Sequence, residues 1–261
     1  MDFQKLYPYY EKKAFRILLK AFRDFSKKIP FEFLTPDNAQ NVISITIKES
    51  NLEKALFKVH YMIGNEAGRL QLKEFQRYEM ELKKIKPSSY PLFSKAFQTW
   101  LVDYYSKFGG ENIKLLTETY ITAVVSEIKK STDENETLEQ MRNRIMKAVN
   151  SPNFYNWQAM RIARTETTFA VNAGTEISGD FTVITMNKRW MSMRDNRERT
   201  SHLEADNQII GKDELCEVGG EKLRYPGDKL NGASASNLVN CRCQRTFVPK
   251  KDADGTYVLN I

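Results

Sequence analysis

The residues at positions 188–202 read KRWMSMRDNRERTSH, and two shorter segments further along belong with them: YPGD at 225–228 and NCRC at 240–243. One of the chain's two histidines and all three of its cysteines fall within this part, together with a tryptophan and a dense run of arginine and aspartate. Packing of a hydrophobic core requires none of these residue types at such density. We therefore expect a compact site in the last third of the chain, held together by polar contacts or by a metal ion.

The composition is that of a globular protein with an excess of positive charge. The chain has 261 residues, 41% of them hydrophobic, and a net charge of +7. This length suits two domains of ordinary size, or one domain with an extension. The positive charge is compatible with contact to nucleic acid or to an acidic protein surface, although lysines on solvated helix faces are the commoner explanation.

Targeting and membrane segments are not evident in the sequence. No apolar run approaches the roughly 20 residues that a membrane-spanning helix needs, and the first residues, MDFQK, lack the charged-then-apolar pattern of a signal peptide. Three cysteines are too few, and odd in number, for the disulfide framework of a secreted domain. We expect the chain to fold in a reducing cytoplasm.

Apolar residues at three- and four-residue steps predict a succession of amphipathic helices. In the first of them Phe15, Phe22 and Phe25 share one face, with lysine and arginine on the others. Thr137 and Gln140 fit a capping box at the start of a later helix. The predicted helices cover residues 9–28, 51–82, 90–107, 111–129, 137–149 and 153–179.

Three points in this helical part are less regular. Residues 42–47 alternate apolar and polar side chains, which fits either a short strand or the approach to the next helix. Gly109 and Gly110 are expected to separate two helices, and Gly64 and Gly68 are weak points within the helix over 51–82.

Beyond the last of these helices the pattern changes to short β-strands. Residues 182–185 and 188–191 are predicted strands, and Gly219-Gly220 is a predicted hairpin turn. The sequence therefore predicts an α+β fold. An elongated, mainly α-helical N-terminal region, residues 1–180, precedes a small α+β C-terminal module with short strands and hairpins, residues 181–261.

Four residues form a candidate metal site: His202, Cys216, Cys241 and Cys243. Thiolate and imidazole are the donors that a structural zinc ion prefers. The spacing differs from that of common zinc fingers, because C-x-C is tighter than C-x-x-C. Two other interpretations stay open: the cysteines are small buried hydrophobic residues beside a hydrogen-bonded histidine, or Cys216 bridges to a later cysteine in an oxidising medium.

Charged residues of both signs gather around the candidate metal site. Alternating arginine and aspartate can form bidentate ion pairs that fix an irregular backbone. The alternative is a metal-dependent nuclease or phosphodiesterase that uses His202, Asp206 and Asp228, with the arginines on phosphates. The charged residues of this group are Arg194, Asp195, Arg197, Arg199, Asp206 and Asp228.

A third group lies on the predicted helix over 153–179. Small residues such as Ala170 and Gly174 let another backbone approach closely, and a buried ion pair involving Arg164 and Glu166 is expected to have a structural role. The lone histidine of the helical part, His60, is expected to be simply packed.

These three groups, in this order, resemble the phage Mu F-like minor head proteins, also called head-morphogenesis or portal-associated minor capsid proteins. The resemblance covers about residues 160–245, and its strength comes from the ordered combination, since each short motif alone is weak. One departure is Cys216, which stands where the family has an apolar or aromatic residue. The residues that carry the resemblance are Ile162 to Glu166, Ala170, Asn172, Trp190, Asp195, Arg199 to His202, Asp206, Tyr225 to Asp228 and Asn240 to Cys243.

The resemblance implies a non-enzymatic virion protein, assembled in the host bacterial cytoplasm and present in few copies per virion in the head interior or at the portal vertex. It would act in head morphogenesis, with the phage portal protein and head proteins as partners and non-specific contact to packaged DNA. A free-standing DNA-binding module is a further alternative. Zinc, in a structural role, is the one cofactor considered. The expected structural signature consists of Arg164, Glu166, Trp190, Asp195, Arg199, Asp206, Asp228 and Arg242.

Overall fold

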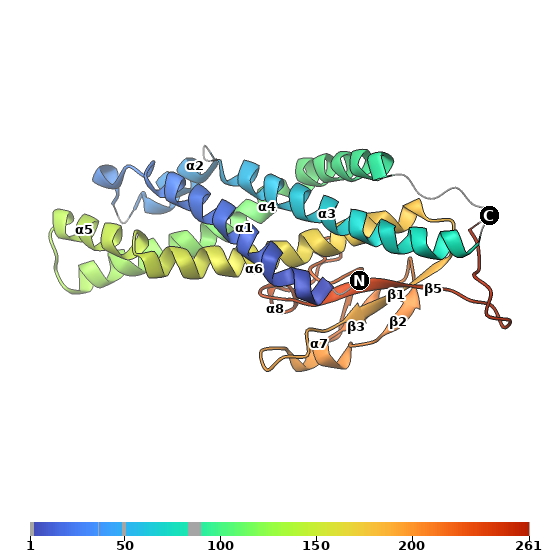
Figure 1. Ribbon diagram of the computed structural model, residues 1–261. Coiled ribbons are helices and arrows are strands. Elements are labelled where there is room, and N and C mark those ends of the chain that lie inside the picture. The colour runs from blue at the N-terminus through green and yellow to red at the C-terminus, as the bar shows by residue number, and fades with distance from the viewer. Residues whose placement is uncertain (1–2, 36, 49–50, 83–89, 261) are drawn as a thin grey trace. The chain divides into compact units, whose positions relative to one another are not determined.

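A computed structural model describes residues 3–35, 37–48, 51–82 and 90–260 (Figure 1). The chain forms two compact units, each assembled from separate segments. The first unit consists of Met1–Ala14, Lys58–Val102 and Arg164–Ile261, and the second of Phe15–Phe57 and Asp103–Ala163.

The regular elements among the described residues of the second unit are all helices. Its elements are parts of α1 (Phe3–Ser26), α4 (Tyr90–Asp133) and α6 (Pro152–Ser178), the first residues of α3 (Leu52–Glu81), and the whole of η1 (Phe31–Phe33), α2 (Ala39–Lys48) and α5 (Leu138–Val149). The capping box of α5 is confirmed, because Gln140 N donates to Thr137 Oγ1 while Thr137 N donates to Gln140 Oε1.

Helix α2 resolves the ambiguity over residues 42–47. Ala39, Ile43 and Ile47 are buried at four-residue spacing, whereas Ile45 is about half exposed. A strand would have placed Ile43, Ile45 and Ile47 on one face. The helical period, and not the alternation, therefore describes this segment.

Helix α4 runs without interruption through Gly109 and Gly110. The prediction of two separate helices there is wrong. Glycine in a helix interior costs only about 1 kcal/mol relative to alanine, which a helix of 44 residues can tolerate. Helix α1 likewise begins earlier than predicted, with Pro8 inside it.

The first unit combines helical segments with two small sheets. Strands β1 (Met186–Met191), β2 (Ile209–Gly211) and β5 (Gln244–Pro249) form an antiparallel sheet in the order β2-β1-β5. Strands β3 (Cys216–Val218) and β4 (Glu221–Leu223) form the predicted hairpin. The elements η2 (Gly179–Phe181), α7 (Thr200–Glu204) and α8 (Ala235–Leu238) complete this unit.

The two central positions of the hairpin turn favour glycine because both have positive φ. Gly219 and Gly220 have φ values of 57° and 77°, and a two-residue turn with positive φ at both positions matches the twist of antiparallel strands. By contrast, the predicted strand over 182–185 is wrong as a regular strand. Only Ile184 forms a β-bridge there, to Leu259 near the end of the chain.

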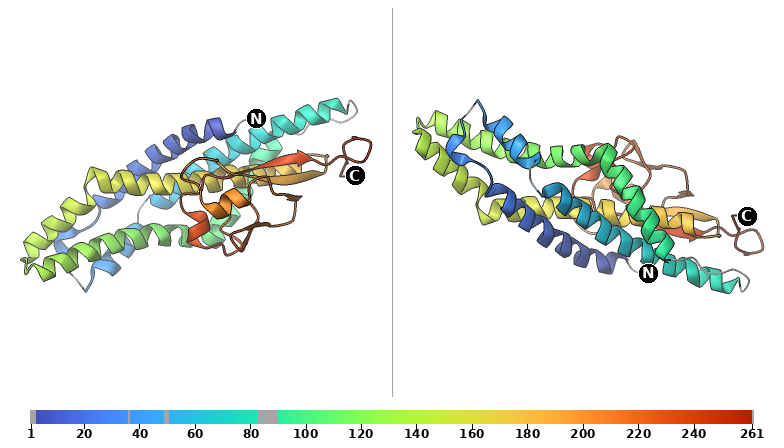
Figure 2. Two further views of the ribbon diagram at one scale, coloured as in Figure 1. Left: turned by 90° about the horizontal axis from the view of Figure 1, so that it is seen from below. Right: turned by 90° about the horizontal axis from the view of Figure 1, so that it is seen from above.

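Within the first unit, helices α3 and α6 pack with their backbones in close contact. The two helices can be followed in Figure 2 by their colours, α3 in blue to cyan and α6 in yellow. A Cβ added at Gly174 of α6 would lie 2.0 Å from the carbonyl oxygen of Gly64 on α3. A Cβ at Gly64 would lie 2.3 Å from Phe97 and 2.9 Å from the carbonyl oxygen of Ala170. The close approach expected at Gly174 is confirmed, and Gly64, taken for a weak point, is its counterpart.

The last third of the chain has a small hydrophobic core of its own. Trp190 of β1 belongs to this core and is fully buried, and the three cysteines belong to the same cluster. The helices, together with the two small antiparallel sheets near the C-terminus, confirm the α+β fold class. The division at residue 180 stays a prediction, because the two compact units cut the chain at different positions.

Among the described residues, no helix has both the length and the apolar character needed to span a membrane.

Candidate metal centre

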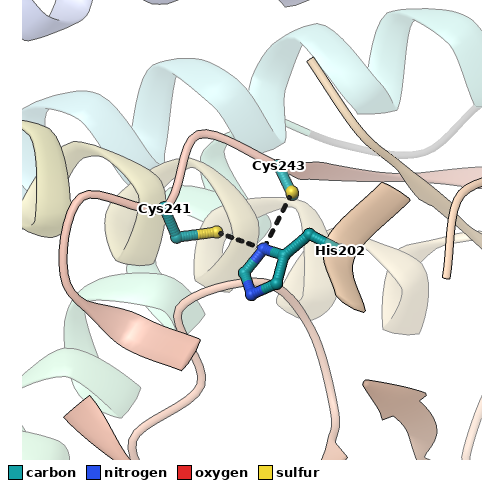
Figure 3. A group of neighbouring side chains, drawn as sticks. All are labelled: His202, Cys241 and Cys243. Atoms are coloured by element: carbon teal, nitrogen blue, oxygen red, sulfur yellow. Dashed lines mark hydrogen bonds between the residues drawn. The ribbon is translucent and has the colours of Figure 1, made fainter. Parts of the chain in front are cut away.

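Three of the four predicted ligands meet in the core of the first unit. His202 lies on α7, and Cys241 and Cys243 lie in the segment between α8 and β5. Nδ1 of His202 is 3.3 Å from Sγ of Cys243 and 3.6 Å from Sγ of Cys241. Figure 3 shows both sulfur atoms directed at this one ring nitrogen. All three side chains are buried, so water does not compete for these donors.

The other ring nitrogen of His202 is held by Asn237 of α8. Nε2 lies 3.2 Å from Oδ1 of Asn237, while the amide nitrogen of Asn237 donates to Val218 O and to Glu221 Oε2. These two bonds fix which end of the Asn237 amide faces His202. Nε2 therefore donates to Asn237, which leaves Nδ1 facing the two sulfur atoms and, once deprotonated, able to bind a metal ion.

The contact between the two cysteine thiols shifts their pKa values in opposite directions. The hydrogen bond from Cys243 lowers the pKa of Cys241 to about 5, and the same contact, with burial, raises that of Cys243 well above its usual range. Burial lowers the pKa of His202, but the hydrogen bond to Cys241, the charge of Cys241 and the hydrogen bond to Asn237 together outweigh this and raise the pKa overall. A pre-formed thiolate beside an imidazole is a soft donor set suited to Zn²⁺.

Cys216 lies outside this group. It is buried on β3 in the same hydrophobic cluster, but its sulfur is not within 4.8 Å of all three other ligand atoms. Burial raises the pKa of its thiol, which makes the thiolate form less accessible. The structure thus brings together three of the four predicted ligands, with His202, Cys241 and Cys243 as the set.

The segment 194–199 holds the cysteine-containing turn in place. Arg242, between the two cysteines, makes a bidentate ion pair with Asp195, in which Nη2 lies 2.7 Å from Oδ1. Arg199 donates to the carbonyl oxygen of Val239. The prediction of bidentate arginine–carboxylate pairs is therefore confirmed for Asp195, and these charged residues determine where Cys241 and Cys243 lie.

Asp206 and Asp228 each organise a separate stretch of backbone. Asp206 accepts from Ser192 N at 2.8 Å and pairs with Arg194. Asp228 accepts from Arg224 N at 2.8 Å and Leu230 N at 2.9 Å. Neither belongs, with His202, to a metal-ligand group among the described residues. The three residues of the nuclease alternative are therefore not assembled into one site.

The remaining signature residues form buried or half-buried ion pairs on α6. Arg164 pairs with Glu11 of α1 at 3.0 Å. Glu166 contacts Nε2 of His60 and Nζ of Lys229, each at 2.8 Å. His60 and Lys229 were missed as partners, because nothing in the sequence indicates which distant residue will face Glu166.

The comparison with known families decides the identity of this region. A family model described as "Phage Mu protein F like protein" matches residues 121–246. Over these residues the chain is phage Mu F-like. The match contains α5, α6, all of β1 to β4, and the three-residue metal-ligand group. No curated protein and no solved structure gave a significant match.

The phage Mu F-like region includes all the residues that were expected to carry the resemblance. It begins some 40 residues before the first motif predicted to carry it, and the family suggests a phage head protein of the virion. Within it, the motifs that lie far apart in sequence meet around the C-x-C turn: Asn172 Nδ2 donates to Cys243 O at 3.1 Å, and Asn240 N donates to Thr165 Oγ1 at 3.0 Å.

Proposed function

We propose that this protein is a phage minor head protein that acts in head morphogenesis at or near the portal vertex, without catalysing a reaction. The observation that carries the proposal is the match of residues 121–246 to the phage Mu F-like family. The geometry supports it, because the charged residues of the matched region are used in ion pairs and turns. A site of this kind rigidifies a small module, as an adaptor between larger assemblies requires.

The metal site has a structural role in this proposal. His202, Cys241 and Cys243 would hold a Zn²⁺ ion, which would cross-link α7 to the segment before β5. Such a cross-link stabilises a region whose strands are only three to six residues long. Because metal binding and folding are coupled, the ion would contribute directly to the free energy of unfolding of this module.

The partners in this proposal are the portal protein and neighbouring head proteins. The net charge of +7 supports additional contact with packaged DNA. Such contact would be made with phosphates and not with base edges, and it would weaken steeply as the salt concentration rises. Few copies per virion are expected, assembled in the host cytoplasm before packaging.

Co-expression with the portal protein encoded in the same phage genome tests the proposal. We expect a complex of defined stoichiometry in native mass spectrometry, and the mass of the protein itself to include one zinc ion. An isolated chain that ignores the portal protein and cleaves DNA when Mg²⁺ or Mn²⁺ is supplied would contradict it. Retention of duplex DNA should fall with salt in the same way for unrelated sequences.

A further inference from the structure

The three-residue group leaves one coordination position of a tetrahedral metal ion unaccounted for. Structural zinc sites are almost always closed by four protein ligands. His202, Cys241 and Cys243 supply three, and no other described histidine, cysteine, aspartate or glutamate, Cys216 included, has a ligand atom within 4.8 Å of all three of theirs. The fourth ligand should come from a side chain that already contacts one of the three.

Glu198 is such a side chain. Its Oε1 lies 3.4 Å from Sγ of Cys243. Glu198 lies four residues before His202, in the segment that holds the cysteine-containing turn. Its neighbours Asp195 and Arg199 make the other two contacts of that segment. This segment therefore makes three contacts with the cysteine-containing turn: Asp195 contacts Arg242, Glu198 contacts Cys243, and Arg199 contacts Val239.

Three of the six ligand-to-ligand separations fit the edges of a coordination tetrahedron. With metal–sulfur bonds of about 2.3 Å and metal–nitrogen or metal–oxygen bonds of about 2.1 Å, two such ligands around one Zn²⁺ lie about 3.5 Å apart. The separations from His202 Nδ1 to the two sulfur atoms are 3.3 and 3.6 Å, and that from Cys243 Sγ to Glu198 Oε1 is 3.4 Å. All three are close to this edge length.

The Glu198 carboxylate is held in place and still has capacity to bind. Oε1 accepts from Met193 N at 3.0 Å, and Oε2 accepts from Arg194 N at 2.7 Å. A carboxylate offers about four lone-pair directions, so these bonds orient the group without exhausting it. Because Glu198 is not within 4.8 Å of all three other ligand atoms, its carboxylate must move toward them when the metal binds. Its partial exposure gives both the room for this movement and a path for the ion.

We propose that Glu198 is the fourth ligand, so that the metal set is His202, Cys241, Cys243 and Glu198. The inference rests on the proposed metal site and adds its missing member. Two thiolates and one carboxylate around a divalent ion leave one net negative charge. The guanidinium of Arg199, which is bonded to Val239 O beside the turn, offsets that charge.

Titration of the whole, metal-free chain with Co²⁺ and then Zn²⁺ tests the inference, with Glu198→Gln as the variant. Glutamine keeps the size of the side chain and can still accept from the backbone amides, but its amide oxygen is a poor metal ligand. We expect the variant to bind Zn²⁺ at least about tenfold more weakly. The d–d absorption of bound Co²⁺ should change, while the sulfur-to-cobalt charge-transfer band keeps its intensity, because both thiolates remain.

Cys216→Ser is the matched control, since it removes a buried thiol from the same hydrophobic cluster. It should leave the metal affinity and both parts of the cobalt spectrum unchanged. Equal affinity and equal spectra for wild type and Glu198→Gln would overturn the inference while leaving the metal site intact. A charge-transfer band that is about one third weaker in Cys216→Ser, together with weaker metal binding, would overturn it in favour of Cys216. A wild-type chain that binds no metal would refute the metal site itself.

Discussion

Asp195 and Arg242 are joined by two parallel contacts between carboxylate and guanidinium, across 47 positions of sequence. The pair fixes the turn that carries Cys241 and Cys243, because Arg242 lies between them. The side chain of Arg242 is only 10% exposed and that of Asp195 is 30% exposed, so both charges are partly shielded from water. The hydrogen bonds to Arg242 lower the pKa of Asp195 to about 2, which keeps the carboxylate charged in any ordinary buffer.

Arg242→Lys should destabilise the first unit. Lysine keeps the charge but cannot make two parallel bonds to one carboxylate. We expect a loss of about 1–2 kcal/mol in the free energy of unfolding, measured by urea denaturation. Arg197→Lys is the control, because Arg197 approaches the same carboxylate only at 3.7 Å and is 67% exposed. Equal losses in both variants would show that the bidentate geometry has no special role.

Gly174→Ala should cost more than its size suggests. The added Cβ would meet the backbone of Gly64, which cannot move aside as a flexible side chain can. We expect at least about 2 kcal/mol of destabilisation, as in overpacked cores, measured as a lower midpoint of thermal or urea unfolding. Gly211→Ala is the control, since its nearest neighbour, at 3.3 Å, is the side chain of Glu214. A Gly174→Ala variant as stable as wild type would contradict the close packing of α3 on α6.

The cluster of His60, Glu166 and Lys229 should make stability depend on pH on the acid side. Burial lowers the pKa of His60 from 6.5. Burial raises the pKa of Glu166, but the charge of Lys229 and the hydrogen bond to His60 outweigh this and lower it from 4.5 to about 2. Both groups bind protons more readily in the unfolded chain, so stability is full above pH 6.5 and falls as the pH decreases toward 2.

His60→Gln isolates the histidine part of this dependence. Glutamine can still donate to Glu166 but does not titrate. Between pH 6.5 and 5, the free energy of unfolding of the variant should fall less steeply than that of wild type, as measured by urea denaturation at several pH values. Parallel curves for the two proteins would mean that His60 is not buried in its neutral form.

Removal of metal should lower the stability of the chain. Because the ligands come from α7 and from the segment before β5, their link would be lost with the ion. We expect exhaustive chelation to lower the melting temperature of wild type and of Cys216→Ser, and to have little further effect on Cys241→Ser, which lacks a ligand. Unchanged melting of the wild type after chelation would contradict a structural metal.

Elements that depend on a few adjacent residues could be predicted from the sequence. The capping box of Thr137 and the hairpin at Gly219-Gly220 depend on a few adjacent residues, and both predictions are confirmed. Residues 42–47 could not be decided, because their helical face is defined only once Ile43 and Ile47 are buried by other segments. The β-branched residues at 182–185 are typical of a strand, but in the structure they form one isolated β-bridge, between Ile184 and Leu259.

The candidate site was predictable in its ligands and not in its surroundings. His202 and the C-x-C pair stand out by residue type, since such donors are rare in this chain. Glu198 and Asn237 do not, because glutamate and asparagine are common on any surface. Glu198 reaches Cys243 from an irregular segment, and Asn237 reaches His202 from the four-residue helix α8, and neither contact can be read from sequence. Cys216 was included because of its residue type, although it departs from the family pattern, and the fold places it outside the ligand group.

Asn237→Ala should weaken metal binding without removing a ligand. The Asn237 side chain accepts from Nε2 of His202, and this bond orients the ring so that Nδ1 faces the two sulfur atoms. Loss of such an orienting partner typically lowers metal affinity by about 10- to 100-fold. Competition with a chromophoric chelator measures the change, and Ser236→Ala on the same short helix, where the side chain is exposed, is the control. If the affinity of Asn237→Ala matches that of Ser236→Ala, the ring is held by the metal and the sulfur atoms alone, and the hydrogen bond to Asn237 contributes nothing to the site.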